Sequence, residues 1–316
     1  MAARFTNIHV QEVNGLKTGM KSVLWSAAAL LLLLSIAVPV LNILTILFLM
    51  VPYVVLYTAL PARGFILHML PVWVLSFLIL GTPALIIGLF FLVPSIVMGH
   101  MFKKQLPAHK VLSRTVITLL VLFLMEFAAF EVILDLSLIS EMSNFVRSVF
   151  NDPQLQPLLP VEWSDEYTEM LIQMMLNTIP LAVISVSFFY AVVTQYISRR
   201  VLKSSGIEVP RMPLAKDWML PRVLVIYYVI VYILSLFVSP DSKSFIGVAV
   251  LNLLPLLRLA FAIQAVGFFF YLAHERKWNP AIPVLIAIPV LLFSPLSLIG
   301  VLDAAFPIRK SFTKKS

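Results

Sequence analysis

The stretch Arg114–Ile139, RTVITLLVLFLMEFAAFEVILDLSLI, decides the class of this protein. It is an apolar run long enough to cross a bilayer as a helix, which takes about 20 residues. Yet it carries three carboxylates, those of Glu126, Glu131 and Asp135. A carboxylate at membrane depth costs on the order of 3 kcal/mol, so it normally faces a protein interior or a wet cavity. The stretch therefore predicts an integral membrane protein with a polar interior.

The composition of the whole chain predicts the same class. Hydrophobic residues make up 61% and charged residues 12%, and the mean hydropathy is +1.00. Soluble domains are about 45–50% apolar and about 25% charged. A chain of 316 residues has room for eight or nine spans joined by short loops. We expect an all-α fold, a polytopic transmembrane helical bundle.

The formal net charge of +8 does not indicate nucleic acid as a partner. The basic residues lie mainly in short loops beside apolar runs, which is typical of cytoplasmic loops and of contact with anionic lipid. We therefore expect a multi-pass protein of the bacterial plasma membrane with a cytoplasmic N-terminus. The partner that the sequence indicates most directly is the lipid bilayer.

Apolar runs and polar breaks divide the chain into four predicted parts. The region between the fifth and sixth spans is acidic and has a single basic residue, Arg147, so we place it outside the cytoplasm. The predicted parts are a cytoplasmic leader at 1–22, a six-helix membrane bundle at 23–203 with the extracytoplasmic loop 140–165, a cytoplasmic linker at 204–221, and C-terminal membrane helices at 222–316.

The last apolar stretch, Pro280–Phe306, has two possible topologies. Three prolines interrupt it, at positions 283, 289 and 295. A single broken span would leave the basic C-terminus outside, against the positive-inside tendency. A re-entrant hairpin would return the C-terminus to the cytoplasm, but the stretch is short for two crossings. The single broken span is favoured, and the side of the C-terminus stays open.

Arg258 is the other charge predicted inside the membrane. It lies 16 residues before His274, which is about 24 Å at 1.5 Å per residue. On the fifth span, Glu131 lies about 25 Å and Glu126 about 18 Å from Arg114. Equal depth allows Arg258 to pair with either glutamate. Such a pair could hold the bundle together, form part of a substrate or proton pathway, or contact a lipid headgroup.

Two asparagines add to this predicted polar network. Asn252 precedes Pro255 on the span of Arg258, and Asn177 precedes Pro180 on the sixth segment. A proline can open a helix and expose carbonyl groups, as in the broken helices of transporters. Ordinary hydrogen bonding between helices is the alternative. The candidate substrate-binding or buried polar set is thus Glu126, Glu131, Asp135, Asn177, Asn252 and Arg258.

The sequence offers no catalytic or metal site. Cysteine is absent, which excludes disulfides and thiolate chemistry. The histidines form no H-x-x-x-H or HExxH pattern, and no GxSxG elbow occurs. The leader has G-x-x-x-G-x-K-S at 15–22, which departs from the spacing of a phosphate-binding loop. We therefore expect no enzyme, no cofactor and no bound metal.

Three segments resemble a known family. They are FFLVPSIVMGHMFKKQLPAHK at 90–110, VPRMPLAKDWMLPR at 209–222 and LIGVLDAAFPIRK at 298–310. Together they resemble the YybS-like family of bacterial integral membrane proteins over nearly the whole chain. The family has no established activity, so this resemblance implies a membrane fold and no mechanism.

The first six predicted spans are also similar to the S components of energy-coupling-factor transporters. That resemblance implies a six-helix bundle that binds a small vitamin or metal. It also implies docking on a coupling membrane subunit through small residues of the first helix, here Ser26, Ala27, Ala28 and Ala29. ATPase subunits would be further partners.

Two functional hypotheses follow. The first is a binding or transport component for a small, vitamin-like solute that works with partner ATPase subunits. The alternative is a membrane scaffold or assembly factor in envelope biogenesis that transports nothing and uses its acidic outer loop as an interaction surface. An enzyme acting on lipid is disfavoured because no catalytic constellation is present.

Overall fold

The computed structural model describes residues 19–133, 137–154, 164–239, 242, 244–306 and 308–312, without the side chains of 133, 310 and 311. Over these residues all regular secondary structure is helical, which confirms the all-α prediction. Asp135, one of the predicted polar residues, lies outside them.

Seven helical segments of the described chain are long and apolar enough to cross a membrane, and an eighth is possible if the bent pair near the C-terminus forms one span. The shorter apolar helix α10 (Val223–Ser235) occupies the remaining predicted segment. The polytopic bundle is therefore confirmed. The seven segments are Gly19–Ala37, Leu41–Ala59, α4 (Ala62–Leu80), α5 (Thr82–Lys103), α6 (Ala108–Ile133), α9 (Ile179–Ser204) and α11 (Phe245–Glu275).

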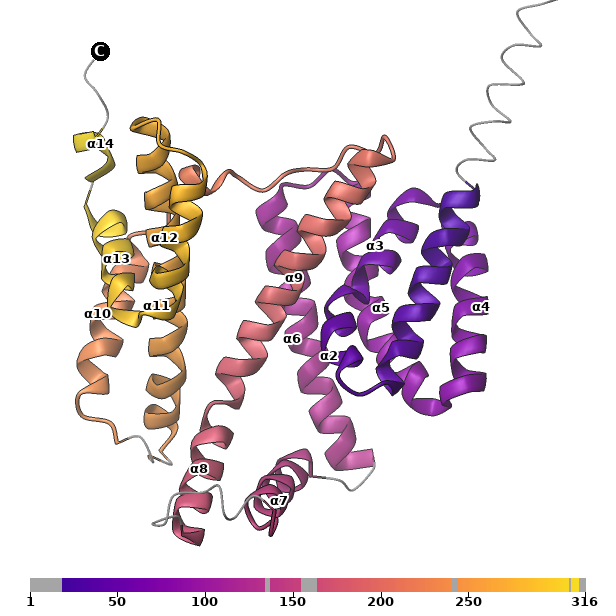
Figure 1. The fold of residues 1–316 in the computed structure, drawn as a ribbon, viewed down its shortest axis with the longest axis horizontal. Coiled ribbons are helices and arrows are strands. Elements are labelled where there is room, and N and C mark those ends of the chain that lie inside the picture. The colour runs from indigo at the N-terminus through magenta and orange to yellow at the C-terminus, as the bar shows by residue number, and fades with distance from the viewer. Residues whose placement is uncertain are drawn as a thin grey trace, which may run out of the picture. The chain divides into compact units, whose positions relative to one another are not determined.

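The helices group into two compact units, each drawn from separate parts of the chain. Unit 1 is Met1–Met125 with Val186–Met212, and unit 2 is Glu126–Ser185 with Pro213–Ser316. Helices α6 and α9, both labelled in Figure 1, each contribute one part to each unit.

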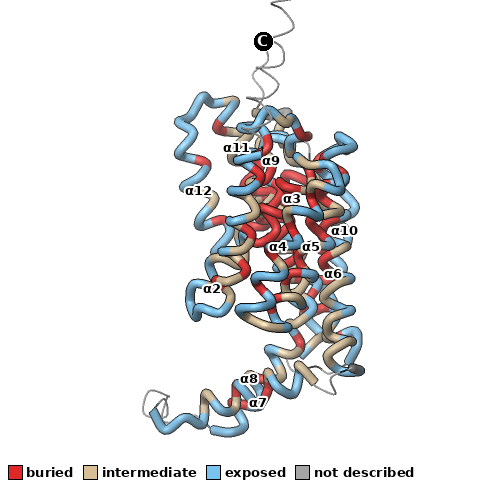
Figure 2. The backbone as a smooth tube through the Cα atoms, turned by 90° about the vertical axis from the view of Figure 1, so that its right-hand side faces the viewer, coloured by how far each residue is buried: buried red, intermediate tan, exposed pale blue. Residues whose placement is uncertain are grey.

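Unit 1 is built around α3 (Met50–Ala59). Every residue of α3 except Tyr57 and Ala59 is buried, and Figure 2 shows buried positions gathered around α3 and α5. Small residues allow this close packing. At Gly99 of α5, a Cβ atom would lie 2.8 Å from a ring carbon of Tyr57. Close approach at small residues is the usual way in which helices pack in lipid.

Unit 2 is built around α11, the longest helix. Gly267 faces the short helix η4 (Ala215–Asp217), and a Cβ there would lie 2.9 Å from the Ala215 carbonyl oxygen. Gly300 of α13 (Ser297–Ala305) sits directly on α11, where a Cβ would overlap the Phe261 carbonyl oxygen. Two glycines thus let the linker and α13 pack on α11.

The C-terminal apolar stretch forms a sharply bent pair. Helix α12 (Ala281–Leu292) and the following Ser294–Ala305 segment, which contains η5 (Ser294–Leu296) and α13, are inclined by 116°. Beyond them, in α14 (Ile308–Phe312), the Arg309 carbonyl oxygen accepts a hydrogen bond from the Tyr271 hydroxyl near the end of α11. The chain thus returns to the end of α11 from which it left. This geometry favours the re-entrant hairpin over the single broken span.

The sixth predicted segment is two helices. Helix α8 (Asp165–Asn177) is followed by the single residue Thr178, and Pro180 is the second residue of α9. A proline fits there because the first N–H groups of a helix have no partner within it. Ser164 caps α8, and Ser137 caps α7 (Leu138–Phe150).

Candidate functional site

Asn252 bridges the break between α8 and α9 in unit 2. Its Nδ2 donates to the Asn177 carbonyl oxygen at 2.7 Å and to the Val248 carbonyl oxygen at 2.7 Å, while its Oδ1 accepts from the Leu181 N–H at 2.8 Å. The Asn177 side chain accepts from Gln173 at 3.0 Å. A helix break leaves backbone groups without partners, and Asn252 supplies them. The structure thus brings Asn177 and Asn252 together, in bonding between helices.

Arg258 has a different environment. It is half-buried on α11, and among the described residues no ion pair joins it to Glu126 or Glu131. Glu126 is half-buried and Glu131 is exposed on α6. Equal depth along two spans fixes the height of a side chain and not the direction in which it points. The third acidic candidate, Asp135, lies outside the described residues.

The small-residue cluster of the first helix is divided between two faces. Ala29 is fully buried in the core of unit 1, and Ser26 shares a 3.0 Å hydrogen bond with Nδ1 of His68 on α4. Ala27 is exposed and Ala28 half-buried. Ala27 and Ala28 are therefore the members of the cluster left for a docking surface. In the part of the chain that the structure describes, no group of three or more His, Asp or Glu residues could hold a metal ion.

A buried ion pair in unit 2 was not among the sequence candidates. The Asp303 side chain is 0% exposed, and the Arg309 side chain is 13% exposed. The Arg309 Nη2 lies 2.6 Å from Asp303 Oδ2, and its Nε lies 3.0 Å from Oδ1. Gln264 of α11 donates to the same carboxylate at 2.5 Å.

The same cluster fastens the linker to α11. Arg309 donates to the carbonyl oxygens of Lys216 at 2.7 Å and Trp218 at 2.8 Å, and Gln264 Oε1 accepts from the Leu220 N–H at 2.9 Å. Buried charges are tolerated where every group has a partner, as here. Sequence reasoning missed it because Asp303 lies near the end of an apolar stretch, where an acidic residue normally faces water. The sequence did contain one indication of this cluster, because most of its partners come from two of the motifs quoted above, 209–222 and 298–310.

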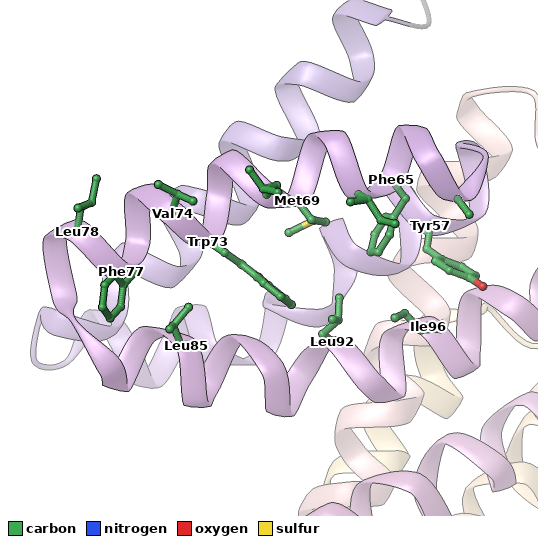
Figure 3. Close-up of a pocket in the computed structure, with 13 residues that line it drawn as sticks. Tyr57, Phe65, Met69, Trp73, Val74, Phe77, Leu78, Leu85, Leu92 and Ile96 are labelled. Atoms are coloured by element: carbon green, nitrogen blue, oxygen red, sulfur yellow. The ribbon is translucent and has the colours of Figure 1, made fainter.

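Unit 1 contains an apolar groove between α4 and α5, with a volume of about 730 Å³. Phe65, Trp73 and Phe77 project from α4 toward Leu85 and Leu92 of α5 (Figure 3). The full lining is Tyr57, Ala62, Phe65, Ile66, Met69, Leu70, Trp73, Val74, Phe77, Leu78, Leu85, Leu92 and Ile96. From Ala62 to Leu78 the groove follows α4 for about 24 Å at 1.5 Å per residue.

A lysine outside the groove lining contacts Tyr57, which lies at one end of the groove. The Lys103 Nζ lies 4.6 Å from the centre of the Tyr57 ring and donates to the Leu60 carbonyl oxygen at 2.7 Å. Ligand sites typically have volumes of about 300–1,000 Å³ and apolar, aromatic walls with few polar groups. The groove fits this description for an apolar or amphipathic molecule.

The chain matches the model of a family described as predicted membrane protein (DUF2232) over residues 26–304. This protein belongs to the DUF2232 family. It is also 24% identical to the uncharacterized protein YybS of Bacillus subtilis (strain 168) over 299 residues, which cover 91% of this chain and 96% of that relative. The predicted YybS-like resemblance is confirmed, and the DUF2232 match includes both the groove and Asp303.

No solved structure matches this DUF2232 protein. The likeness to S components therefore stays a prediction. As a family member with seven or eight candidate spans, the chain is a multi-pass integral membrane protein.

Proposed function

We propose that this DUF2232 protein binds a small apolar or amphipathic solute in the membrane and serves as the binding component of a transporter. The groove between α4 and α5 carries the proposal, because its volume of about 730 Å³ suits a small molecule and its walls are almost wholly apolar. The ligand would therefore lie along α4 in contact with aromatic side chains, and Lys103 would face any acidic group at one end.

Partner subunits complete this proposal. The chain has no phosphate-binding loop of standard spacing, so ATP hydrolysis would come from partner ATPase subunits acting through a coupling membrane subunit. The exposed Ala27 of the first helix is the residue we propose for docking. We place the protein in the bacterial plasma membrane with its N-terminus in the cytoplasm, following the distribution of basic loops. The role is binding, without catalysis.

A pair of tryptophan substitutions on α4 tests the groove. Leu70 lines it and is 58% exposed, whereas Leu67 is 74% exposed and does not line it. We expect a small molecule to co-purify with the wild type in mild detergent. Leu70→Trp should fill the groove and prevent this co-purification, as measured by mass spectrometry of the extract. Leu67→Trp should retain it. Equal retention by both variants, or extracts with bulk lipid alone, would count against the proposal.

One observation favours the scaffold as the second candidate. The outer helices α7 and α8 carry exposed apolar side chains, among them Phe145 (67% exposed) and Tyr167 (48% exposed). Exposed aromatic residues are common in protein interfaces. Under this reading, Phe145→Ser would abolish crosslinking to an envelope protein while Leu70→Trp would not. If the protein is instead a transport component, Leu70→Trp should lose the solute, and Phe145→Ser should retain it.

A further inference from the structure

A second, smaller pocket lies at the end of α9 in unit 1. It has a volume of about 160 Å³ and is lined by Arg199, Lys203, Glu208, Val209 and Arg211. Arg199 and Lys203 are four residues apart on α9 and therefore share one helix face. Arg211 comes from the segment after the helix, which turns back toward it. The pocket is separate from the groove, since the two have no lining residue in common.

The wall that carries Arg211 is fixed to the rest of unit 1. Gly206 has a φ of +81°, a conformation that favours glycine, and reverses the chain after α9. Val209 is buried in a cluster with Leu202 of α9 and Phe102 of α5. Gln105 donates to the Glu208 carbonyl oxygen at 2.7 Å. These contacts hold the segment in place, so the pocket is a defined feature of the fold.

The charges around the pocket are not neutralised by the protein. Three cationic side chains and one carboxylate line it, which leaves a net charge of 3 − 1 = +2. Within the described ranges, none of the three cationic side chains makes a hydrogen bond or an ion pair. The Arg199 Nε is buried and has no hydrogen-bond partner there. A buried donor without a partner is costly, and like charges gathered together add to that cost.

We propose that this pocket binds a phosphate group. Guanidinium groups bind phosphate oxygens through paired, charge-assisted hydrogen bonds, and a lysine adds a compact positive charge. Bound there, a phosphate would supply the acceptor that Arg199 Nε lacks and would balance the net positive charge. Two sources share this chemistry, the headgroup of an anionic phospholipid and a soluble phosphorylated compound.

The position of the pocket suits a lipid headgroup. Arg199 and Lys203 lie in the last turns of the candidate span Ile179–Ser204, where a spanning helix reaches the headgroup region. Basic pockets among membrane helices are known to hold anionic headgroups. This inference is independent of the proposed groove ligand, because Leu70→Trp would leave the phosphate pocket unchanged.

The experiment measures binding to the purified full chain in a neutral detergent by native mass spectrometry. Phosphatidic acid and diacylglycerol have the same acyl chains and differ by the phosphate, and glycerol 3-phosphate has the phosphate without the chains. We expect phosphatidic acid to bind more tightly than diacylglycerol. Arg199→Gln should weaken its binding roughly tenfold or more, as expected for a lost charge-assisted hydrogen bond.

Three variants sharpen the test. Arg200→Gln removes the neighbouring charge, which lies outside the pocket and contacts the Tyr196 hydroxyl at 3.4 Å, and should leave the affinity unchanged. Lys203→Gln should also weaken binding, and it provides a second test of the pocket if Arg199→Gln does not fold. Glu208→Gln removes the only carboxylate of the lining. It should strengthen binding about two- to threefold, because the negative side chain that repels the bound phosphate is gone.

The outcomes distinguish a lipid headgroup from a soluble phosphorylated compound, and both from a pocket that binds no phosphate. Competition by glycerol 3-phosphate would support the pocket with a soluble phosphorylated compound as ligand, and binding of phosphatidic acid without that competition would support it with a lipid headgroup. Equal affinities for diacylglycerol and phosphatidic acid would overturn the proposal. So would equal losses in Arg199→Gln and Arg200→Gln, since the effect would then come from net charge alone.

Discussion

Two clusters of basic side chains in this protein differ in one respect, which is whether the chain supplies their partners. In unit 2, the Arg309 guanidinium is bonded to the buried carboxylate of Asp303 and to two carbonyl oxygens. In unit 1, the side chains of Arg199, Lys203 and Arg211 meet at a pocket without such partners among the described residues. A partnered charge stabilises the fold, and an unpartnered one is available for a ligand. The first cluster should respond to mutation through stability and the second through binding.

The largest effect is expected from breaking the buried pair. Arg309→Leu leaves the Asp303 carboxylate buried without its cation, which typically costs about 3–5 kcal/mol. The midpoint of thermal unfolding in detergent should fall steeply. The double variant Asp303→Leu/Arg309→Leu should recover much of the loss, since no unpaired charge remains. A single variant as stable as the wild type would show that the pair contributes nothing.

Next comes the packing of α13 on α11. Gly300→Ala places a methyl group where the Phe261 carbonyl oxygen lies, so backbone must move. Overpacking of this kind costs about 1–3 kcal/mol. Gly19→Ala is the control, because a Cβ there has nothing within 4 Å. Thermal unfolding should separate the two variants, and equal midpoints would place α13 away from α11.

A smaller effect is expected at the break between α8 and α9. Asn252→Ala removes three hydrogen bonds and leaves the Asn177 carbonyl and the Leu181 N–H without the partner that Asn252 provided. Polar contacts between membrane helices contribute roughly 0.6–2 kcal/mol. Asn42→Ala, which removes one long hydrogen bond of 3.4 Å, is the control. Hydrogen exchange at the start of α9 should rise in the Asn252 variant alone.

The smallest effect concerns the exposed pair of Arg147 on α7 and Glu169 on α8. The Arg147 guanidinium donates to the Glu169 carboxylate and lowers its pKa below the usual 4.5. A lowered folded-state pKa means that the stabilisation is complete above pH 4.5 and is lost as the pH falls through the lower value.

Melting curves of the wild type and Glu169→Gln should therefore converge in acid and differ slightly near neutral pH. Arg147→Gln removes the other member of the pair and should differ from the wild type in the same pH range as Glu169→Gln. A difference between Glu169→Gln and the wild type that persists in strong acid would contradict this account of the pair.

Apolar runs predicted most of the spans well. Helix α5 begins at Thr82, where Gly81 and Pro83 interrupt the apolar sequence, and ends at Lys103, where the apolar run meets two lysines, so the sequence marks both of its ends. The sequence predicts that Pro180 can open the sixth segment, and the structure interrupts this segment at Thr178, where Asn252 of α11 bonds the backbone groups that the interruption exposes. The sequence around Pro180 does not indicate which distant residue will bond these backbone groups.

The polar sites were less predictable, for a physical reason. Arg258 and Glu131 could be matched in depth because rise per residue is constant, but the direction of each side chain depends on packing. Asp303 and Arg309 are six residues apart across Pro307, and neither spacing nor hydropathy indicates that they meet. The pocket of Arg199 and Arg211 depends on the turn at Gly206, which brings together two basic residues that read as an ordinary solvated end of a span.

The most direct test of the comparison is the midpoint of thermal unfolding of the wild type, Arg199→Gln and Arg309→Leu, each with and without phosphatidic acid. Without lipid, Arg199→Gln should unfold at or slightly above the wild-type temperature, because an uncompensated charge is removed, and Arg309→Leu should unfold well below it. Phosphatidic acid should raise the midpoints of the wild type and Arg309→Leu and should raise that of Arg199→Gln much less, because the variant binds the lipid more weakly. A lipid-induced rise in Arg199→Gln equal to that of the wild type would contradict the distinction between the two clusters.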